Sequence, residues 1–307
     1  MDGVTFDLDP GETLGLVGES GSGKSVLVRT IMGLLPDRGV HVSGRATFGD
    51  TDLLGPTRIA RRLWGTEIAM IFQDPMTALN PTKRIGAHLT ESMRHHLGLD
   101  RRSATRRAIE LLEQVGIPDP ASRVRQYPHE LSGGMRQRVT IAIALACQPS
   151  LLIADEPTTA LDVTVQQQIL DLLGGLQRDL GMSMILVTHD LGVVAGRTKR
   201  LAVMYAGQIV ELGATHSVFG RLRHPYTEGL LASIPRIGDR SQAPLAALPG
   251  RPPNPAALPA GCRFEPRCPY ASDQCRVERP VFEFDESEHG VRCWHPRNAT
   301  TLSGASA

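Results

Sequence analysis

The sequence of 307 residues lacks long apolar runs, is poor in cysteine and carries almost no net charge. Its longest apolar stretch, VTIAIALAC at residues 139–147, is about half as long as a membrane-spanning helix, so we expect the chain not to cross a bilayer. Five cysteines are too few for a disulfide-stapled secreted protein, and the first residues show no charged-then-apolar leader, which favours the cytoplasm. The net charge of +1 gives no reason to expect a nucleic acid partner.

Lysine is also scarce, because only Lys24, Lys83 and Lys199 stand among the 33 basic residues. The remaining composition, with 41% hydrophobic and 21% charged residues, is that of a folded globular protein. At roughly 150 residues per domain, the length allows about two domains.

Short apolar runs bounded by glycine and aspartate alternate with helical patterns through the first 235 residues. Runs that are apolar on both faces are typical of buried parallel strands, so we predict an α/β domain with a mostly parallel sheet at 1–235. Helix-period patterns at 84–99 and 103–117 indicate a helical subdomain inserted at about 77–150. Proline density predicts a linker at 236–260, followed by a cysteine-containing extension at 261–307. The predicted strands lie at 13–18, 68–72, 151–155, 184–189 and 201–207.

The pattern GxxxxGKS occurs after the first predicted strand and opens a predicted helix, which is the context that a phosphate-binding loop requires. Its glycines allow backbone N–H groups to surround phosphate oxygens, and the helix N-terminus adds its positive dipole end. We expect Lys24 to reach the terminal phosphates and Ser25 to hold Mg²⁺. The predicted nucleotide-binding residues are Gly18, Glu19, Ser20, Gly21, Ser22, Gly23, Lys24 and Ser25.

Acidic residues follow the predicted strand LLIAD. Mg²⁺ prefers hard oxygen ligands, and hydrolysis needs a base near the γ-phosphate. We expect Asp155 to hold Mg²⁺ and Glu156 to polarise the attacking water. His189 ends another predicted strand, at the sheet edge where ligands bind in open α/β folds, so we interpret it as a γ-phosphate sensor.

The string ELSGGMRQR at 130–138, together with the phosphate loop and LLIADEP, resembles the signature of the ABC ATPase family. In that family Ser132, Gly133 and Gly134 complete the ATP site of a partner subunit. The physical reading agrees, because these residues open a helix whose amides can donate to phosphate. Since the sequence contains no second phosphate loop, that phosphate must come from another chain.

The resemblance also implies roles for two further residues. Gln73 matches a glutamine that contacts Mg²⁺ or its water and relays the nucleotide state to a transmembrane subunit, and Asp162 matches a loop that crosses the dimer interface. It implies a homologous ATPase subunit and two permease subunits as partners, at the cytoplasmic face of the plasma membrane. Family members usually carry a further strand and an adenine-stacking aromatic well before the loop. Because 17 residues precede Gly18, we expect an N-terminal segment to be missing.

Within the family, the segments 204–235 and 261–271 are similar to ATPase subunits of oligopeptide and dipeptide importers, a group that also contains nickel importers. This implies ATP-driven peptide uptake, with an extracytoplasmic binding protein as an indirect partner. Nickel uptake remains an alternative. A non-transport ABC ATPase is disfavoured, because the 108 residues from Lys24 to Ser132 leave no room for a long coiled coil and the chain holds one cassette.

Four cysteines cluster in the extension with the spacing C-x5-C-x6-C-x17-C, whereas Cys147 lies in a predicted apolar helix. In a reducing compartment such a cluster favours a metal over disulfides. The spacing lacks the close pairs of structural zinc sites, and one cysteine precedes proline, as some iron–sulfur ligands do. Related importer ATPases are similar to [4Fe–4S] proteins, while zinc and free thiols or disulfides stay open. The candidate ligands are Cys262, Cys268, Cys275 and Cys293.

Overall fold

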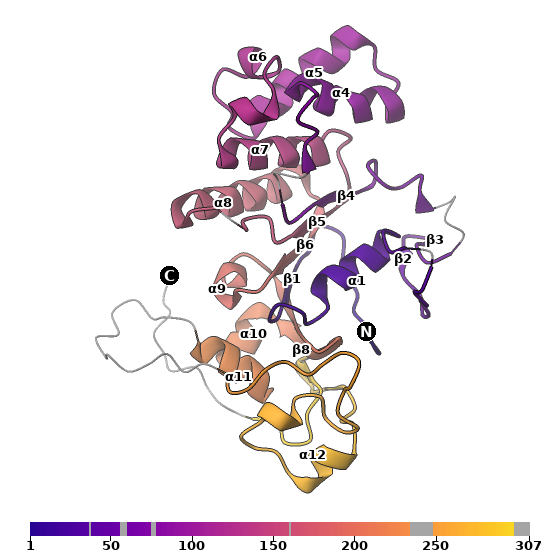
Figure 1. Ribbon diagram of the computed structural model, residues 1–307, viewed down its shortest axis with the longest axis vertical. Helices are drawn as coiled ribbons and strands as arrows, with labels where there is room; N and C mark the ends of the chain where they lie inside the picture. Colours follow the sequence, from indigo (N-terminus) through magenta and orange to yellow (C-terminus); the bar gives the residue numbers. More distant parts are fainter. Residues whose placement is uncertain (37, 56–59, 75–77, 160, 234–247, 298–307) are drawn as a thin grey trace. The chain divides into compact units, whose positions relative to one another are not determined.

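The chain divides into two compact units in a computed structural model (Figure 1). The first unit comprises residues 1–8, 13–27 and 188–307, and the second comprises 9–12 and 28–187. The first part of the predicted linker, at 236–247, lies outside the described residues. The described residues are 1–36, 38–55, 60–74, 78–159, 161–233 and 248–297.

The first unit is built on a mixed set of strands. β1 (Thr13–Val17) pairs in parallel with β7 (Arg200–Tyr205), and both fall within segments predicted as buried parallel strands. β7 continues through a turn into the antiparallel strand β8 (Gln208–Ala214). Two short strands of the extension, β10 (Gly290–Val291) and β9 (Glu283–Phe284), add to β8 in antiparallel order.

In the second unit, β5 (Leu151–Asp155) pairs in parallel with β4 (Ile68–Ile71) on one side and with β6 (Ser183–Thr188) on the other. Every residue of β5 and β6 is buried, which is why each strand has an apolar run, LLIA or MILV, rather than an alternating pattern. The parallel α/β class is therefore confirmed. A separate hairpin consists of β2 (Thr47–Phe48) and β3 (Thr51–Asp52).

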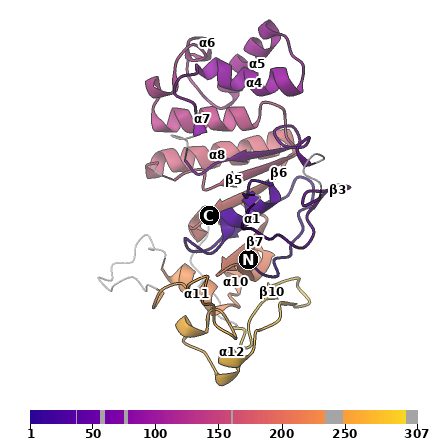
Figure 2. The ribbon, with the colours of Figure 1, turned by 45° about the vertical axis from the view of Figure 1, so that its right-hand side comes forward.

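The predicted helical subdomain is present in the second unit. Both predicted helices are confirmed as α4 (Ile85–His96) and α5 (Arg101–Gln114), which pack on each other and on α7 (Gly133–Ala144). Figure 2 shows α7 lying beside α8 (Val163–Leu180) in this unit. Cys147, expected within a helix, instead lies half-buried in the turn after α7.

The remaining elements are short. None of the helices in the residues that the structure describes is long and apolar enough to span a bilayer. Short 3₁₀ helices cover Pro128–Glu130 and Glu265–Arg267. The other helices are α1 (Lys24–Ile31), α6 (Pro120–Arg123), α9 (Leu191–Val194), α10 (Thr215–Gly220), α11 (Pro225–Ala232) and α12 (Asp273–Val277).

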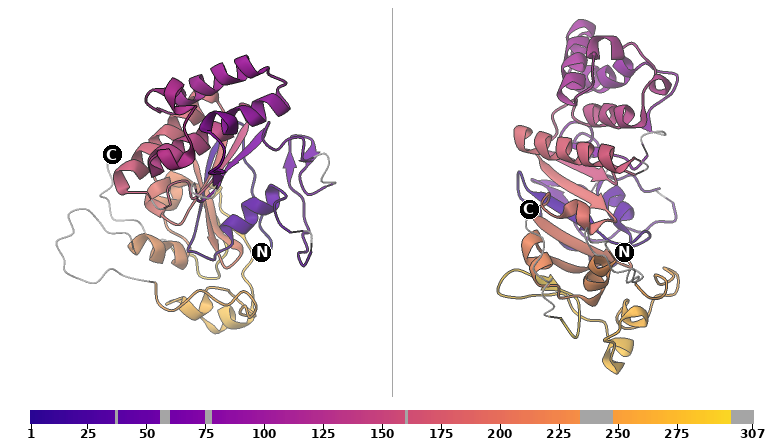
Figure 3. Two further views of the ribbon diagram at one scale, coloured as in Figure 1. Left: turned by 45° about the horizontal axis from the view of Figure 1, so that its top comes forward. Right: turned by 90° about the vertical axis from the view of Figure 1, so that its left-hand side faces the viewer.

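The extension lies beside the strands of the first unit (Figure 3). A buried carboxylate attaches it to them. Glu211, in the middle of β8, is fully buried and accepts a 2.8 Å hydrogen bond from the His289 ring. It also accepts backbone N–H groups of Arg223 and His224, at 2.8 and 3.0 Å. Because each carboxylate oxygen has a donor, the charge can stay buried while it joins β8 to the chain before β10 and to the start of α11.

Candidate nucleotide site and cysteine pocket

The predicted phosphate loop begins where β1 ends. Gly18 is buried, and a Cβ atom there would overlap the backbone carbonyl oxygen of Met204 in β7. Lys24 begins α1 and is 4% exposed. Its Nζ donates to the Gly18 carbonyl oxygen at 2.7 Å and to the Glu19 carbonyl oxygen at 3.1 Å. The loop is therefore closed around its own lysine, with Ser25 in the first turn of the helix.

Other residues of the first unit fix this loop and place the predicted sensor. The Ser22 carbonyl oxygen accepts the N–H of Gly207 at 2.7 Å, which ties the loop to the β7–β8 turn. His189 is exposed and comes directly after β6. The next residue, Asp190, accepts the Gly192 N–H at 2.7 Å and caps α9.

Gln73, Asp155 and Glu156 are three predicted site residues of the second unit, and a hydrogen bond joins Gln73 to Glu156. Asp155 is fully buried at the end of β5, and Glu156 follows with a left-handed backbone, at φ 47°. The Glu156 carboxylate accepts Gln73 Nε2 at 2.9 Å and Thr159 Oγ1 at 3.1 Å. A left-handed glutamate is strained, and such strain is typical of functional sites. The hydrogen bond between them makes Gln73 and Glu156 one polar group.

The signature residues also occupy the positions that their sequence predicts. Ser132 caps α7 and accepts the Met135 N–H at 3.3 Å. A Cβ atom on Gly134 would lie 2.9 Å from Val165 in α8, so this close helix contact requires a glycine. Asp162 caps α8 by accepting the Val165 N–H at 2.9 Å. The signature and the Asp162 loop are thus neighbours in the second unit.

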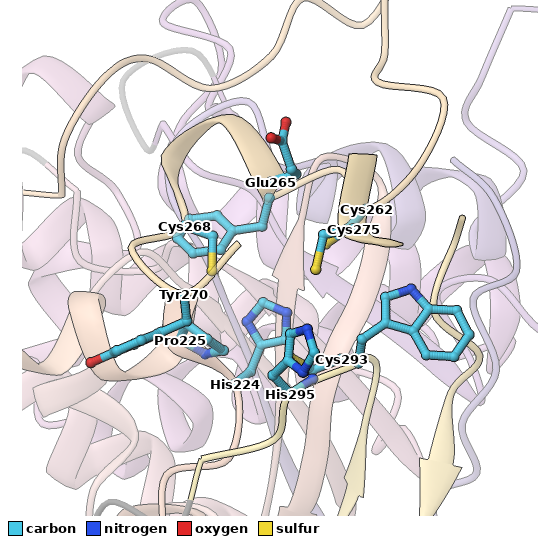
Figure 4. Close-up of a pocket in the computed structure, with 11 residues that line it drawn as sticks. His224, Pro225, Cys262, Glu265, Cys268, Tyr270, Cys275, Cys293 and His295 are labelled. Atoms are coloured by element: carbon cyan, nitrogen blue, oxygen red, sulfur yellow. The ribbon is translucent and has the colours of Figure 1, made fainter. Parts of the chain in front are cut away.

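The four cysteines of the extension line one pocket in the first unit. Figure 4 shows the sulfur atoms of Cys268 and Cys275 directed toward a common space, with Cys293 and His295 across from them. His224 also lines this pocket, and no sequence motif pointed to His224 or His295. The predicted clustering of the cysteines is therefore seen, with two imidazoles beside them.

Burial in this pocket favours the neutral thiol form of Cys262, Cys268 and Cys293 over the thiolate. Burial raises the pKa of Cys262 to about 11 and that of Cys293 to about 12, and it also raises the pKa of Cys268. Burial lowers the pKa of His224 to about 4, so this imidazole is neutral at pH 7. Within the described residues, no three histidine, cysteine or acidic side chains are arranged as ligands of one metal ion. The predicted cluster is thus not confirmed, although its donors share a pocket.

Sequence reasoning missed two residues that contact the phosphate loop. Arg267, in the extension, forms an ion pair with Glu19, and the hydroxyl of Tyr226 in α11 accepts the Glu19 N–H at 2.8 Å. Neither belongs to a recognisable motif, because each contact joins positions more than 200 residues apart. The one local feature that could have drawn attention to Arg267 was its position next to Cys268.

The parallel strands, the phosphate loop and the acid group at the end of β5 define an ATPase of the phosphate-loop class. Comparison with known families narrows this class. The profile of the family described as "ABC transporter" matches residues 1–159, and that described as "Oligopeptide/dipeptide transporter, C-terminal region" matches residues 210–275. The chain belongs to the ABC transporter family.

Individual relatives agree with this assignment. The chain is 49% identical to the dipeptide transport ATP-binding protein DppD of Escherichia coli over 297 residues, 96% of this chain and 90% of the relative. It is 52% identical to the oligopeptide transport ATP-binding protein OppD of Bacillus subtilis, over 96% and 83% of the two chains. The solved ATP-binding cassette MJ0796, bound to ADP and phosphate, is similar at a TM-score of 0.61 and 26% identity, over 69% of this chain and 89% of that one.

We predict that Cys262 and Cys293 of the metal-free chain alkylate slowly at pH 8. The thiolate is the reactive form, and a pKa of about 11 makes it at least about 100-fold rarer in Cys262 than in an ordinary thiol. The rates, followed by mass spectrometry with iodoacetamide, should rise as the pH approaches 11 to 12. The urea-unfolded chain is the control, and equal rates for folded and unfolded chains at pH 8 would contradict the burial of these thiols.

Proposed function

We propose that this chain is the ATP-hydrolysing subunit of a bacterial importer of oligopeptides or dipeptides. The observation that carries the proposal is the succession of two family matches in one chain, a general ABC transporter match and one to the C-terminal region of oligopeptide and dipeptide transporters. The curated relatives at about half identity are named for the same two substrates. Membrane permease subunits and an extracytoplasmic binding protein complete the importer, with this chain at the cytoplasmic face of the membrane.

Each residue of the phosphate site has a proposed role in this reaction. The loop from Gly18 to Ser25 holds the phosphates, with the Lys24 ammonium leaving the loop carbonyls for the β- and γ-phosphate oxygens. Ser25 and Asp155 are each proposed as a ligand that would hold Mg²⁺, and His189 as the residue that would sense the γ-phosphate. The support is the placement of Lys24 and Ser25 at the start of α1 and of Asp155 at the end of a parallel strand.

Glu156 is the proposed general base, and Gln73 is its partner. The 2.9 Å hydrogen bond from Gln73 Nε2 orients the Glu156 carboxylate. Gln73 thereby has a means of reporting the state of the reaction to the membrane subunits.

The signature implies that two ATPase subunits share each site. Ser132, Gly133 and Gly134 open α7, whose first amides can donate to the γ-phosphate of ATP held by a partner subunit. Asp162, next to the signature, lies at the proposed subunit interface. ATP closes the dimer, hydrolysis opens it, and the permease subunits follow this motion.

We further propose that Cys262, Cys268, Cys275 and Cys293 bind a [4Fe–4S] cluster. The four thiols line one pocket, and iron–sulfur clusters take cysteine thiolates as ligands. The cluster would supply a covalent link between four segments of the extension. Binding must remove protons, because burial holds the pKa values of three of these thiols above their ordinary range.

The transport function is tested with Glu156→Gln in proteoliposomes that contain the complete importer. Loss of the base should lower ATP hydrolysis by about 100-fold or more and abolish uptake of a labelled dipeptide, while ATP binding is retained. Asp179→Asn, an exposed change at the end of α8, is the matched control and should leave both rates unchanged. ATP hydrolysis at the wild-type rate by Glu156→Gln would exclude Glu156 as the general base. Uptake of nickel in place of dipeptide would exclude peptides as the transported substrate.

The cluster is tested by the visible spectrum of anaerobically purified protein. We expect absorption near 400 nm that disappears in Cys268→Ser, together with about four irons per chain by metal analysis. Cys147→Ser, outside the pocket, should keep the absorption. Stoichiometric zinc without iron, or no bound metal, would contradict the proposal.

A further inference from the structure

A buried ion pair connects the extension to the phosphate loop of the same unit. The Arg267 guanidinium faces the Glu19 carboxylate end on, through its two terminal nitrogens, with Nη1–Oε2 at 2.6 Å and Nη2–Oε1 at 3.0 Å. The arginine side chain is 3% exposed and the glutamate side chain 27%. Such bidentate pairs are both strong and specific in geometry.

Other contacts fix Arg267 independently of the loop. Its Nε donates to the carbonyl oxygen of Pro249 at 2.8 Å, and its guanidinium lies 5.7 Å from the centre of the Tyr205 ring in β7. The hydrogen bond with Glu19 raises the pKa of Arg267 further above its already high value, so the side chain is always a cation. The extension therefore presents a positive charge at a fixed place.

Glu19 is held at three points. Besides the carboxylate, its N–H donates to Tyr226 Oη at 2.8 Å and its carbonyl oxygen accepts Lys24 Nζ at 3.1 Å. Tyr226 is fully buried and packs on Tyr205 and on Phe264 of the extension, with ring centres 4.6 and 5.5 Å away. Two of the three groups that hold Glu19, Tyr226 and Arg267, thus lie outside the loop, and Arg267 belongs to the extension.

The charge of Glu19 needs this partner, because the loop that carries it is the one proposed to bind the nucleotide polyphosphate. An unopposed carboxylate in that loop repels phosphate, whereas one paired with a buried arginine contributes little net charge. We propose that Arg267 is a positioning residue for ATP binding, through which the extension sets the phosphate affinity of its own chain. This inference rests on the proposed function, since it assumes that the loop binds ATP.

The test is calorimetric titration of the full-length chain with MgATP, MgADP and adenosine. Arg267→Ala leaves Glu19 unopposed and should weaken MgATP binding at least about tenfold, MgADP binding less, and adenosine binding not at all. Glu19→Gln leaves the cation unopposed and should tighten MgATP binding about threefold or more. The double variant should return to within about threefold of wild type. Arg276→Ala removes an exposed arginine of the extension and is the matched control, expected to bind as wild type does.

If the ion pair only stabilises the fold, both single variants and the double variant should weaken the binding of all three ligands alike. That pattern, or unchanged binding by Arg267→Ala, would overturn the inference. If Arg267→Ala does not fold, Glu19→Gln decides, because unchanged or weaker MgATP binding contradicts the charge argument. Absence of MgATP binding by the wild-type chain would instead remove the proposed function itself.

Discussion

The close approach of Gly18 to the Met204 carbonyl oxygen is the constraint on which the phosphate-binding end of the first unit depends. The parallel pairing of β1 with β7 brings the end of one strand against the other, and no side chain fits between them. The chain therefore turns at once into the loop, where the carbonyl oxygens of Gly18 and Glu19 accept the Lys24 ammonium. The same turn places Glu19 within reach of Tyr226 and Arg267.

The second unit carries acidic side chains at the end of β5 and, after β4, the amide of Gln73 that is hydrogen-bonded to one of them. Asp155 is buried as the last residue of the strand, and Glu156 leaves it in a left-handed conformation. The Glu156 N–H donates to the Val187 carbonyl oxygen at 2.9 Å, and its carboxylate is held by Gln73 and Thr159. A strained residue needs such surroundings, since left alone it relaxes to an ordinary backbone conformation.

Sequence reasoning found the parts of the fold and site that depend on local chemistry. Strands buried on both faces, such as β5, have an unbroken apolar sequence, and the Gly18–Ser25 loop has fixed spacing. Strand β8 was missed because Glu211 interrupts its apolar pattern. That carboxylate can be buried only through His289 and two backbone N–H groups, whose positions depend on the tertiary fold.

The same limit explains the outcome for the candidate sites. The cysteines could be predicted to meet, because they lie close together in the sequence, whereas His224 enters their pocket from α11 and could not. Arg267 resembles every other arginine in a chain that has many. Its pairing with Glu19 joins positions 248 residues apart, which no spacing rule describes.

The central claim is that one chain contains only half of each reaction centre, because its signature residues contact the ATP that a partner subunit holds. The most direct measurement is the hydrolysis rate per chain of strictly monomeric protein, verified by sedimentation, against that of the assembled importer at saturating MgATP. The account predicts that the monomer binds ATP but turns it over far more slowly than the assembly. Equal rates for the two would contradict it.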